Sequence, residues 1–425
     1  MLVDRHGFRL GTEVAEAADA YNAGLDRFLA LSGGADTLLE QATRVDPDFG
    51  LAWATLAAWR HFGGDHEAAR TALSHATGAA MSPREQSYVG LLSTAFLASV
   101  SPALDAAGTH LERYPQDVLA FEQVMLASHF GGGGLEDRRR ALSMFAAARG
   151  EVVDDWAFLG VSAFVHQEAG LFDEAERLGR RSLSLRPDNA DAMHSVAHVH
   201  YERGAHEEGS SELDSWMGLH DDHGPFHIHF TWHLALHDLG LGEWERSLDR
   251  YRATISPTVG GPGTMSDAPT LLWRLMLRGF DPSRLPWDEL VEVAGPMAAT
   301  PTFRYGDWHV AFALAGGRSD AGLAELEAAL TERGDGRPQA PTMVRVVRGI
   351  RAYANGEFES AAQLLDVPDD DIPFLGGSRA QREVVEDTVI DAMVKAGNGR
   401  RARELLEQRL SRRPSRDDLR LAEGL

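Results

Sequence analysis

Paired helices recur along this chain every ~30–40 residues, and this recurrence constrains the fold more than any other feature. The clearest pair lies at 155–187, DWAFLGVSAFVHQEAGLFDEAERLGRRSLSLRP. Its first helix ends at Gly170, Phe172 and Ala175 open the second helix, and Pro187 ends it. Helix pairs at this spacing bury a continuous core only by stacking on their neighbours. We therefore predict an all-α chain, because no segment shows a convincing strand pattern of alternating apolar and polar residues.

The unit at 155–187 resembles the tetratricopeptide repeat (TPR), in which small residues let two antiparallel helices touch and a proline ends the pair. Similar hairpins turn at glycine elsewhere, and weaker copies fill the ranges between them. The turn glycines are Gly64, Gly204, Gly242, Gly356 and Gly397, and the weaker copies span 20–47, 85–115, 117–148, 268–298 and 305–335. We predict one TPR-like right-handed α-solenoid over 1–425, with about eleven hairpins closed around a central pocket. The segment 190–316 is expected to line its groove.

Three glycine-rich stretches interrupt the helices. The run GGGG at 131–134 lacks the GK[ST] of a phosphate loop and is predicted to be a flexible hairpin turn. Residues 257–267, PTVGGPGTMSD, and 366–378, DVPDDDIPFLGGS, are longer than a tight TPR turn. Long loops in compact folds are often functional, so both are candidates to border a site.

Composition excludes several chemistries. The chain has 425 residues and a net charge of −23, which argues against nucleic acid as a partner because phosphate binding needs a basic surface. It has no cysteine, which rules out thiolate nucleophiles, disulfides and zinc–thiolate sites. Lys395 is the only lysine, and we expect no pyridoxal phosphate. No apolar run is long enough to span a membrane and no signal peptide is visible, so a cytoplasmic location is expected.

Histidine is concentrated between Ala190 and Tyr251, which hold ten of the eighteen histidines. Two pairs, His194/His198 in HSVAH and His229/His233 in HFTWH, are spaced i, i+4. This spacing places both imidazoles of a pair on one helix face, a turn apart. Five of the other six fit surface, core or loop positions: His200 and His237 on helices, and His206, His220 and His223 in loops.

Helix phase, counted from each turn glycine at about 100° per residue, relates the two pairs. His194 and His198 lie ten and six residues before Gly204, while His229 and His233 lie thirteen and nine before Gly242. All four fall in one arc of about 100°, opposite the positions that pack a hairpin's helices together. In TPR-like arrays that side of the first helix lines the concave groove. The sequence therefore predicts four imidazoles facing one cavity.

Several segments follow one another in a specific order and spacing: REQSYV at 84–89, FDEAE at 172–176, HSVAHVHYE at 194–202, HFTWHLALHDLGLGEWE at 229–245, SDAPTLLWRL at 266–275, GDWHVAFALAG at 306–316 and GGSRAQRE at 376–383. This order and spacing give the chain a resemblance to the tetratricopeptide repeat protein 38 group. It implies a TPR-like solenoid with these signature residues: His194, His198, His229, His233, Asp267, Arg274, Asp307, His309, Gln381 and Arg382. Members often carry a further histidine in the fourth hairpin. Met125 replaces it here, with His129 a turn later.

One hypothesis is an enzyme acting on a small molecule in the groove. The four histidines with Asp267 or Asp307 match the ligands that zinc, iron, manganese or copper accept, and a bound metal could activate water or polarise a carbonyl. Without a metal, the same imidazoles could act as acid and base. Arg274, Gln381 and Arg382 would hold an anionic group of the substrate. Helix phase places Asp307 in the groove arc but not His309, for which a packing role stays open.

The alternative is a non-catalytic scaffold that binds a peptide or partner protein in its groove, the usual task of TPR arrays. The usual clamp for a peptide carboxylate uses lysine, arginine and asparagine, whereas histidines occupy comparable positions here. HxxxH without the glutamate of HExxH does not indicate a zinc peptidase. The sequence favours the enzyme, with a small-molecule ligand and no nucleic acid or membrane as partner. A homodimer is left open.

Overall fold

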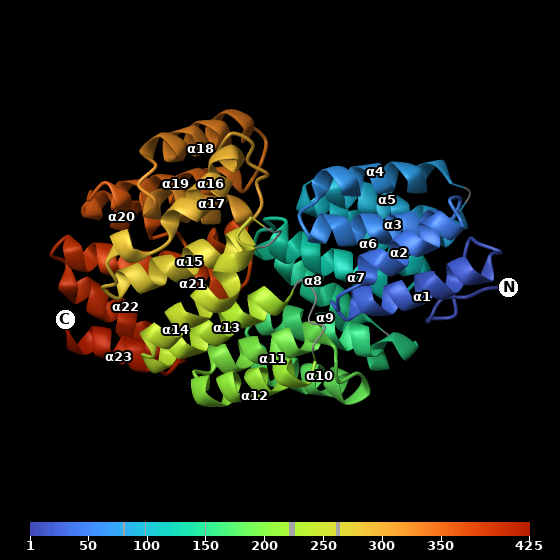
Figure 1. The fold of residues 1–425 in the computed structure, drawn as a ribbon, viewed down its shortest axis with the longest axis horizontal. Coiled ribbons are helices and arrows are strands. Elements are labelled where there is room, and N and C mark those ends of the chain that lie inside the picture. The colour runs from blue at the N-terminus through green and yellow to red at the C-terminus, as the bar shows by residue number, and fades with distance from the viewer. Residues whose placement is uncertain (80, 98, 149, 221–225, 261–263) are drawn as a thin grey trace. The chain divides into compact units, whose positions relative to one another are not determined.

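The chain folds as an array of helices in the computed structural model, which describes residues 1–79, 81–97, 99–148, 150–220, 226–260 and 264–425 (Figure 1). Over these ranges, one isolated bridge between Val3 and Arg9 is the sole β-structure. Consecutive helices pack in pairs joined by short turns. The predicted all-α, TPR-like solenoid is confirmed, whereas its closure around a central pocket stays a prediction.

The chain divides into two compact units. The first comprises Met1–Ser128, Asp137–Val196 and Met217–His227, and the second comprises His129–Glu136, Ala197–Trp216 and Ile228–Leu425. The division falls inside one continuous helix, α11 (Ala190–Glu202). Whether the chain acts as the single domain predicted from the sequence stays a prediction.

Five hairpins precede α11. Their helices are α1 (Ala15–Leu29), α2 (Ala35–Val45), α3 (Gly50–Phe62), α4 (His66–Gly78), α5 (Pro83–Leu97), α6 (Val100–Arg113), α7 (Val118–Met125), α8 (Leu135–Ala147), α9 (Trp156–Glu168) and α10 (Phe172–Leu185). A π-helical turn, Leu126–Phe130, extends α7, and a 3-10 turn, Gly150–Asp154, precedes α9.

Six hairpins start with α11, and one final helix follows them. The helices after α11 are α12 (His206–Leu219), α13 (Phe226–Leu241), α14 (Trp244–Arg250), α15 (Thr264–Leu277), α16 (Trp287–Ala298), α17 (Gly306–Gly316), α18 (Asp320–Arg333), α19 (Ala340–Ala354), α20 (Phe358–Leu365), α21 (Arg379–Lys395), α22 (Gly399–Arg412) and α23 (Arg416–Glu423). Short π or 3-10 turns lie at Tyr251–Ile255, Ser256–Thr258, Pro282–Arg284 and Ile372–Leu375. The eleven hairpins in the described ranges agree with the number predicted.

The predicted turn glycines take the left-handed conformation that ends a helix. Gly204 and Gly242 follow α11 and α13 with φ of 68° and 76°. A Cβ disfavours this region, which is why glycine is the usual residue just past a helix end. After α17 the left-handed residue is Arg318, with φ of 58°, although Gly316 and Gly317 stand directly before it. The positions of the glycines alone would therefore place this turn too early in the chain.

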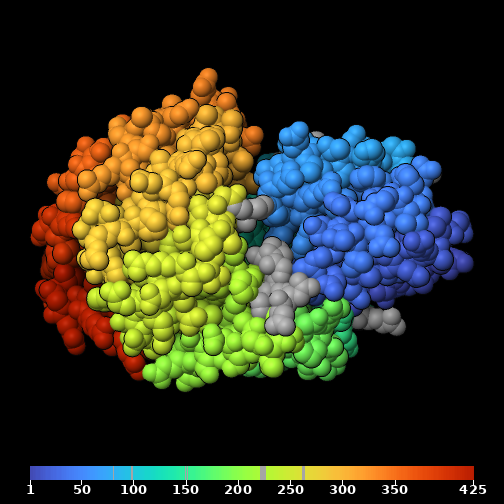
Figure 2. Space-filling model, viewed as in Figure 1, coloured from blue at the N-terminus to red at the C-terminus, as the bar shows by residue number. Residues whose placement is uncertain are grey.

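Buried tryptophans join the helices of the second unit. Trp273 on α15 donates its indole N–H to Thr388 Oγ1 on α21 at 3.0 Å. Trp308 on α17 donates to the carbonyl of Leu375 at 2.9 Å. Because both rings are buried and both indoles are satisfied, they add apolar area without the cost of an unpaired donor. Helices α15 and α17 are almost entirely buried, so the yellow to orange surface of the second unit in Figure 2 belongs mostly to the other segments of this range.

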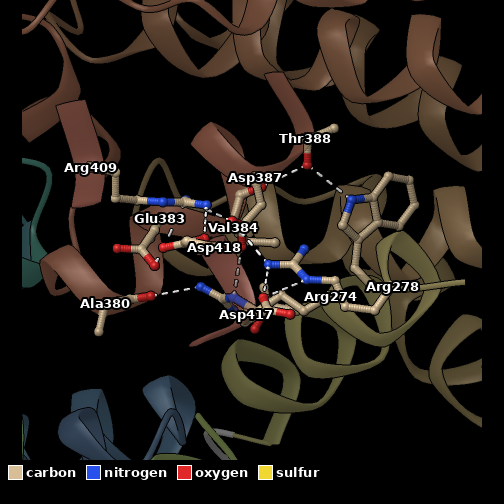
Figure 3. Close-up of polar contacts among 12 residues, drawn as sticks. Arg274, Arg278, Ala380, Glu383, Val384, Asp387, Thr388, Arg409, Asp417 and Asp418 are labelled. Atoms are coloured by element: carbon tan, nitrogen blue, oxygen red, sulfur yellow. Dashed lines mark hydrogen bonds and ion pairs between the residues drawn. The ribbon is translucent and has the colours of Figure 1, made fainter. Parts of the chain in front are cut away.

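A buried network of ion pairs anchors the C-terminal helices within the second unit (Figure 3). Arg409 on α22 reaches Asp387 on α21 at 2.8 Å, and Arg278, the residue directly after α15, reaches Asp417 on α23 at 2.6 Å. Burial by itself would raise the pKa of Asp387, but the charges of Arg409, Arg278 and Arg274 lower it below its usual range. The carboxylate is therefore ionised at neutral pH and paired on several sides.

A smaller ionic cluster holds the start of the first unit. Arg84, from the segment REQSYV, donates to Asp117 at 2.7 Å and to Asp4 at 2.8 Å. His110 approaches Asp117 at 2.9 Å from its Nε2. This cluster connects the N-terminal segment around Asp4 to α5, to α6 and to Asp117, the residue before α7. Arg84 of the segment REQSYV therefore has a structural role in this cluster.

Two predictions about loops need correction. Helix α15 starts at Thr264, so Asp267 lies in its first turn and not after a flexible loop of 257–267; residues 261–263 lie outside the described ranges. His206 is the first residue of α12 and is buried, not a loop residue. The glycine run 131–134 does connect α7 and α8, and 366–378 is a loop with one 3-10 turn. His223 lies outside the described residues.

No helix in the described ranges is both long enough and apolar enough to cross a bilayer.

Candidate metal centre

Four histidines from α11 and α13 come together. His194 and His198 project from α11, and His229 and His233 project from α13, each pair one helical turn apart. One ring nitrogen from each lies within 4.8 Å of those from the other three. The clustering predicted from helix phase is confirmed. Whether the cluster binds metal or takes part in catalysis stays a prediction.

Asp267 orients one ring of the cluster. Its Oδ2 lies 2.9 Å from Nδ1 of His229, and its carboxylate is buried in the first turn of α15. An ionised carboxylate can only accept, so Nδ1 of His229 carries the hydrogen. The lone pair of His229 is then on Nε2, which lies 3.2 Å from Nε2 of His233. A carboxylate on the outer nitrogen is the arrangement that fixes metal-binding histidines in proteins.

Aromatic packing holds the rings of α13 in place. The ring of His229 stacks on Trp232 with centroids 5.3 Å apart and planes at 14°. The ring of His233 lies edge-on to those of His198 and His229, at 4.5 and 4.7 Å. Fixed rings lose little side-chain entropy when they bind a ligand, so the packing favours a preformed site.

His194 is held by two phenylalanines. Its ring is parallel to that of Phe164 on α9, with centroids 5.5 Å apart. Phe226, the first residue of α13, meets the same ring edge-on at 5.0 Å. Neither Phe164 nor Phe226 was predicted from the sequence as a support for His194, although each lies on the first helix of a hairpin.

Asp307 and His309 make contacts away from the four imidazoles. Asp307 accepts hydrogen bonds from the backbone of Thr302 at 3.1 Å and Phe303 at 2.6 Å, and burial raises its pKa to about 6. His309 donates from Nδ1 to the carbonyl of Tyr305 at 2.6 Å and packs on Trp308. Burial, with a smaller effect of the Arg274 charge, lowers its pKa to about 3. These contacts brace the start of α17, and a role in catalysis stays a prediction.

The three predicted substrate-binding residues contact the chain itself. Arg274 donates to the carbonyl of Ala380 at 2.7 Å and pairs with Asp387 at 3.3 Å. Gln381 forms a capping box with Ser378 at the start of α21. Arg382 donates to the carbonyls of Gly377 and Gly376. These bonds hold the loop GGS against α21, and binding of a ligand by these residues stays a prediction.

The solved structures that this chain resembles are similar to it only at low identity and low TM-score. No family model matches the chain. Solved structures similar to it include the TPR domain of P58(IPK), 15% identical over 93% of this chain and 99% of that one, with a TM-score of 0.23. The human IFIT1 dimer with m7Gppp-AAAA is 12% identical over 95% and 91%, with a TM-score of 0.36. Naa15/Naa10 bound to HypK-THB is 13% identical over 93% of this chain and 63% of that one, with a TM-score of 0.26. TM-scores this low carry no argument about ligands or partners.

Proposed function

We propose that the protein is a non-catalytic binding protein of TPR-like fold whose four clustered histidines hold a divalent transition-metal ion. One observation carries the metal: Asp267 holds Nδ1 of His229, and Nε2 of His229 lies 3.2 Å from Nε2 of His233. Two nitrogens bound to one tetrahedral zinc at about 2.0–2.1 Å lie about 3.3–3.4 Å apart. The two Nε2 atoms are therefore already separated as two ligands of one ion would be.

The other two histidines can complete the coordination. Their ring nitrogens lie within 4.8 Å of the rest, so each would approach by about 1.5 Å or less to meet the tetrahedral spacing. Imidazole is a ligand that zinc and iron accept readily, while manganese prefers oxygen ligands. Zinc and iron therefore fit the donor set better than manganese does.

The number of ligands favours binding over catalysis. Structural zinc sites are closed by four protein ligands, whereas catalytic sites keep one position for water or substrate. Four imidazoles would fill a tetrahedral ion. A TPR-like array also has a general role in recognising peptides or partner proteins, so we place the bound partner on the same helical faces.

An enzyme acting on a small molecule is the second candidate. It is favoured by the chain of contacts from Asp267 through His229 to His233. With a hydrogen held on its Nδ1, His229 presents an unprotonated Nε2 that can accept a proton, which is the role of a general base. The enzyme is favoured over the non-catalytic binding protein only if the site holds no ion or holds it with three histidines.

We also place the chain in the tetratricopeptide repeat protein 38 group. The segments that resemble this group make defined contacts: Glu85 of REQSYV accepts from the backbone of Gly11 at 2.9 Å, and Ser378 and Gln381 of GGSRAQRE cap α21. The order and spacing of these segments, rather than their contacts, support this placement.

Elemental analysis of protein purified without a histidine tag tests the metal. We expect about one metal ion per chain in the wild type and none in His198→Ala/His233→Ala. His227→Ala, an exposed position on the same helix α13, is the matched control and should keep the ion. Absence of metal in the wild type, after reconstitution with Zn²⁺, Fe²⁺ and Mn²⁺ in turn, would overturn the proposal. The ion should also be released below about pH 6, because protonated imidazole cannot bind metal.

The His194→Ala variant separates the two candidates. In a closed site this change removes one of four ligands, and we expect weaker metal binding with the partner still bound. If the ion is held as tightly as in the wild type, the fourth position is open, which supports the enzyme and contradicts the non-catalytic reading.

A further inference from the structure

The connection between α8 and α9 is longer than other connections between hairpins of the first unit. It spans the eight residues 148–155, of which residue 149 lies outside the described ranges, and it includes the 3-10 turn Gly150–Asp154. Three other connections have four residues each: 46–49, 114–117 and 186–189. Loops tolerate insertions, and binding residues are found on them more often than on the elements they join. The longer connection is therefore a candidate border of a binding site.

This connection borders a cavity of about 400 Å³. Ala148, Val153 and Asp154 line the cavity from the connection, and the other lining residues belong to α8, α9 and α10. All of them lie in the first unit. Val153 and Asp154 are exposed, so the cavity is open to solvent on their side. Pockets that bind small molecules have volumes of about 300–1,000 Å³. The cavity is therefore large enough to admit such a ligand.

The inner wall of the cavity is apolar. Phe145 of α8 and Phe158 of α9 are both buried and stacked, with ring centroids 5.6 Å apart and planes at 28°. Leu159 of α9 and Leu178 of α10 line the same cavity and belong to one buried cluster. A ligand with an aromatic body would cover this wall, which removes apolar surface of both ligand and protein from water.

The rim of the cavity carries charged groups, most of which are already compensated. Arg177 donates to Glu174 from Nε at 2.8 Å and from Nη2 at 2.5 Å. Asp154 lies two residues before α9, where the helix dipole stabilises a negative charge. Arg181, one turn after Arg177 on α10, is exposed, and its guanidinium forms no ion pair or hydrogen bond with any residue that the structure describes. The rim thus offers one uncompensated cation.

We infer that this cavity binds a small aromatic carboxylate, with its ring against Phe145 and Phe158 and its carboxylate on Arg181. A guanidinium presents paired N–H donors that match the two oxygens of a carboxylate. His166 also lines the cavity and donates from Nδ1 to the carbonyl of Ser162 at 2.7 Å. Its neutral ring therefore keeps Nε2 as an acceptor for a hydroxyl or amide donor on the ligand. The site shares no residue with the histidine cluster.

Calorimetric titration of the full chain with biphenyl-4-ylacetate tests the inference, with biphenyl-4-ylacetamide as the uncharged counterpart of the same shape. We expect the acid to bind and the amide to bind at least five-fold more weakly, because the amide cannot form the charged contact. Two results would overturn the inference: no binding of the acid at millimolar concentration, or equal affinity for acid and amide.

Charge variants on α10 assign the carboxylate contact. Arg181→Gln should reduce the affinity for the acid to that for the amide and leave the amide unchanged. Arg180→Gln is the matched control, because Arg180 is exposed, pairs with Glu176 at 2.7 Å and does not line the cavity. Glu174→Gln releases Arg177 as a second cation and should strengthen binding of the acid at least two-fold. Unchanged affinity for the acid in Arg181→Gln would contradict the assignment.

A filled cavity tests the location without altering any charge. Ala146 lines the cavity at an exposed position of α8, and Ala147 beside it is exposed but does not line the cavity. Ala146→Trp should abolish binding of acid and amide, whereas Ala147→Trp should bind both as the wild type does. Circular dichroism and thermal unfolding confirm that each variant is folded. Binding of the acid that persists in Ala146→Trp would place the ligand elsewhere.

The cavity and the histidine cluster can be tested separately. Ala146→Trp should keep the metal proposed for the cluster while losing the acid, and addition of a chelator to the wild type should remove the metal while leaving binding of the acid unchanged. Loss of acid binding on removal of the metal would contradict the inference that the cavity is a separate site.

Discussion

Arg409 on α22 donates to Asp387 on α21 at 2.8 Å, and both side chains are at most 3% exposed. The same arginine also reaches Asp418 on α23. A buried ion pair of this kind contributes little compared with an apolar pair of the same size, but removing one partner leaves the other charge buried and uncompensated. The network is therefore sensitive to the loss of single members.

We expect Arg409→Met to lower the free energy of unfolding by about 3–5 kcal/mol. The matched control is Arg412→Met on the same helix. Arg412 is 55% exposed and lies 3.6 Å from Glu386, so its loss should change stability by about 0–1 kcal/mol. Urea unfolding at pH 7 measures both. Equal effects of the two variants would contradict the role assigned to the buried pair.

Asp267→Asn tests the orientation of His229 without removing a histidine. The amide cannot hold Nδ1–H of His229 as strongly as the carboxylate does, so the ring loses its preferred tautomer. We expect metal affinity to fall by about 10–100-fold while the helical content stays unchanged. Competition with a chromogenic chelator measures the affinity. Asp288→Asn, in the first turn of α16, is the control and should bind metal as the wild type does. Unchanged affinity in Asp267→Asn would show that the carboxylate is not needed for the site.

More of the backbone than of the candidate site could be predicted from the sequence. The hairpins were predictable because turn glycines and apolar spacing act locally, and all six predicted turn glycines have positive φ. The clustering of the four histidines was predictable because the angle of a residue around its helix, counted from the turn glycine, can be compared between neighbouring hairpins. Both features depend on regular geometry rather than on side-chain detail.

Contacts between distant segments could not be predicted. Asp267 was recognised only through family resemblance, because its bond to His229 depends on where α15 begins. Arg274 and Arg382 appeared suited to an anionic ligand, whereas the structure shows bonds to carbonyls of the chain. Asp191 lies thirteen residues before Gly204, just as His229 lies before Gly242, so phase could have placed it in the same arc. Charge alone gave no sign that it is buried.

Acid should destabilise the second unit through a pair of neutral histidines. His206 and His237 face each other with Nδ1 atoms 3.3 Å apart. Burial, then the charge of Arg413, lowers the pKa of His206 from 6.5 to about 4, and burial with neighbouring histidine charges lowers that of His237. The unfolded chain therefore takes up protons first. Stability from this pair is complete above about pH 6.5 and is lost as the pH falls toward 4, by about 3 kcal/mol for His206.

Unfolding by urea between pH 7 and 5 measures this loss. The double variant His206→Met/His237→Met should show a smaller decrease over the same range, whatever its absolute stability. The control His75→Gln, at an exposed position on α4, should follow the wild type. A decrease of the same size in the double variant would assign the acid sensitivity to other groups.

Two glycines on α12 should respond in opposite ways to the same substitution. A Cβ on Gly209 would lie 2.5 Å from Cε1 of His237 and 2.7 Å from Cβ of His200, while one on Gly218 would meet nothing within 4 Å. Gly209→Ala forces the packed ring to move, at a cost of about 1–3 kcal/mol. Gly218→Ala reduces the entropy of the unfolded chain and should stabilise by about 0.4–1 kcal/mol. Thermal unfolding compares the two, and stabilisation by Gly209→Ala would show that α12 does not approach His237 this closely. Because both substitutions add the same methyl group to the same helix, the difference between them measures the close packing of α12 on α13 and not helix propensity.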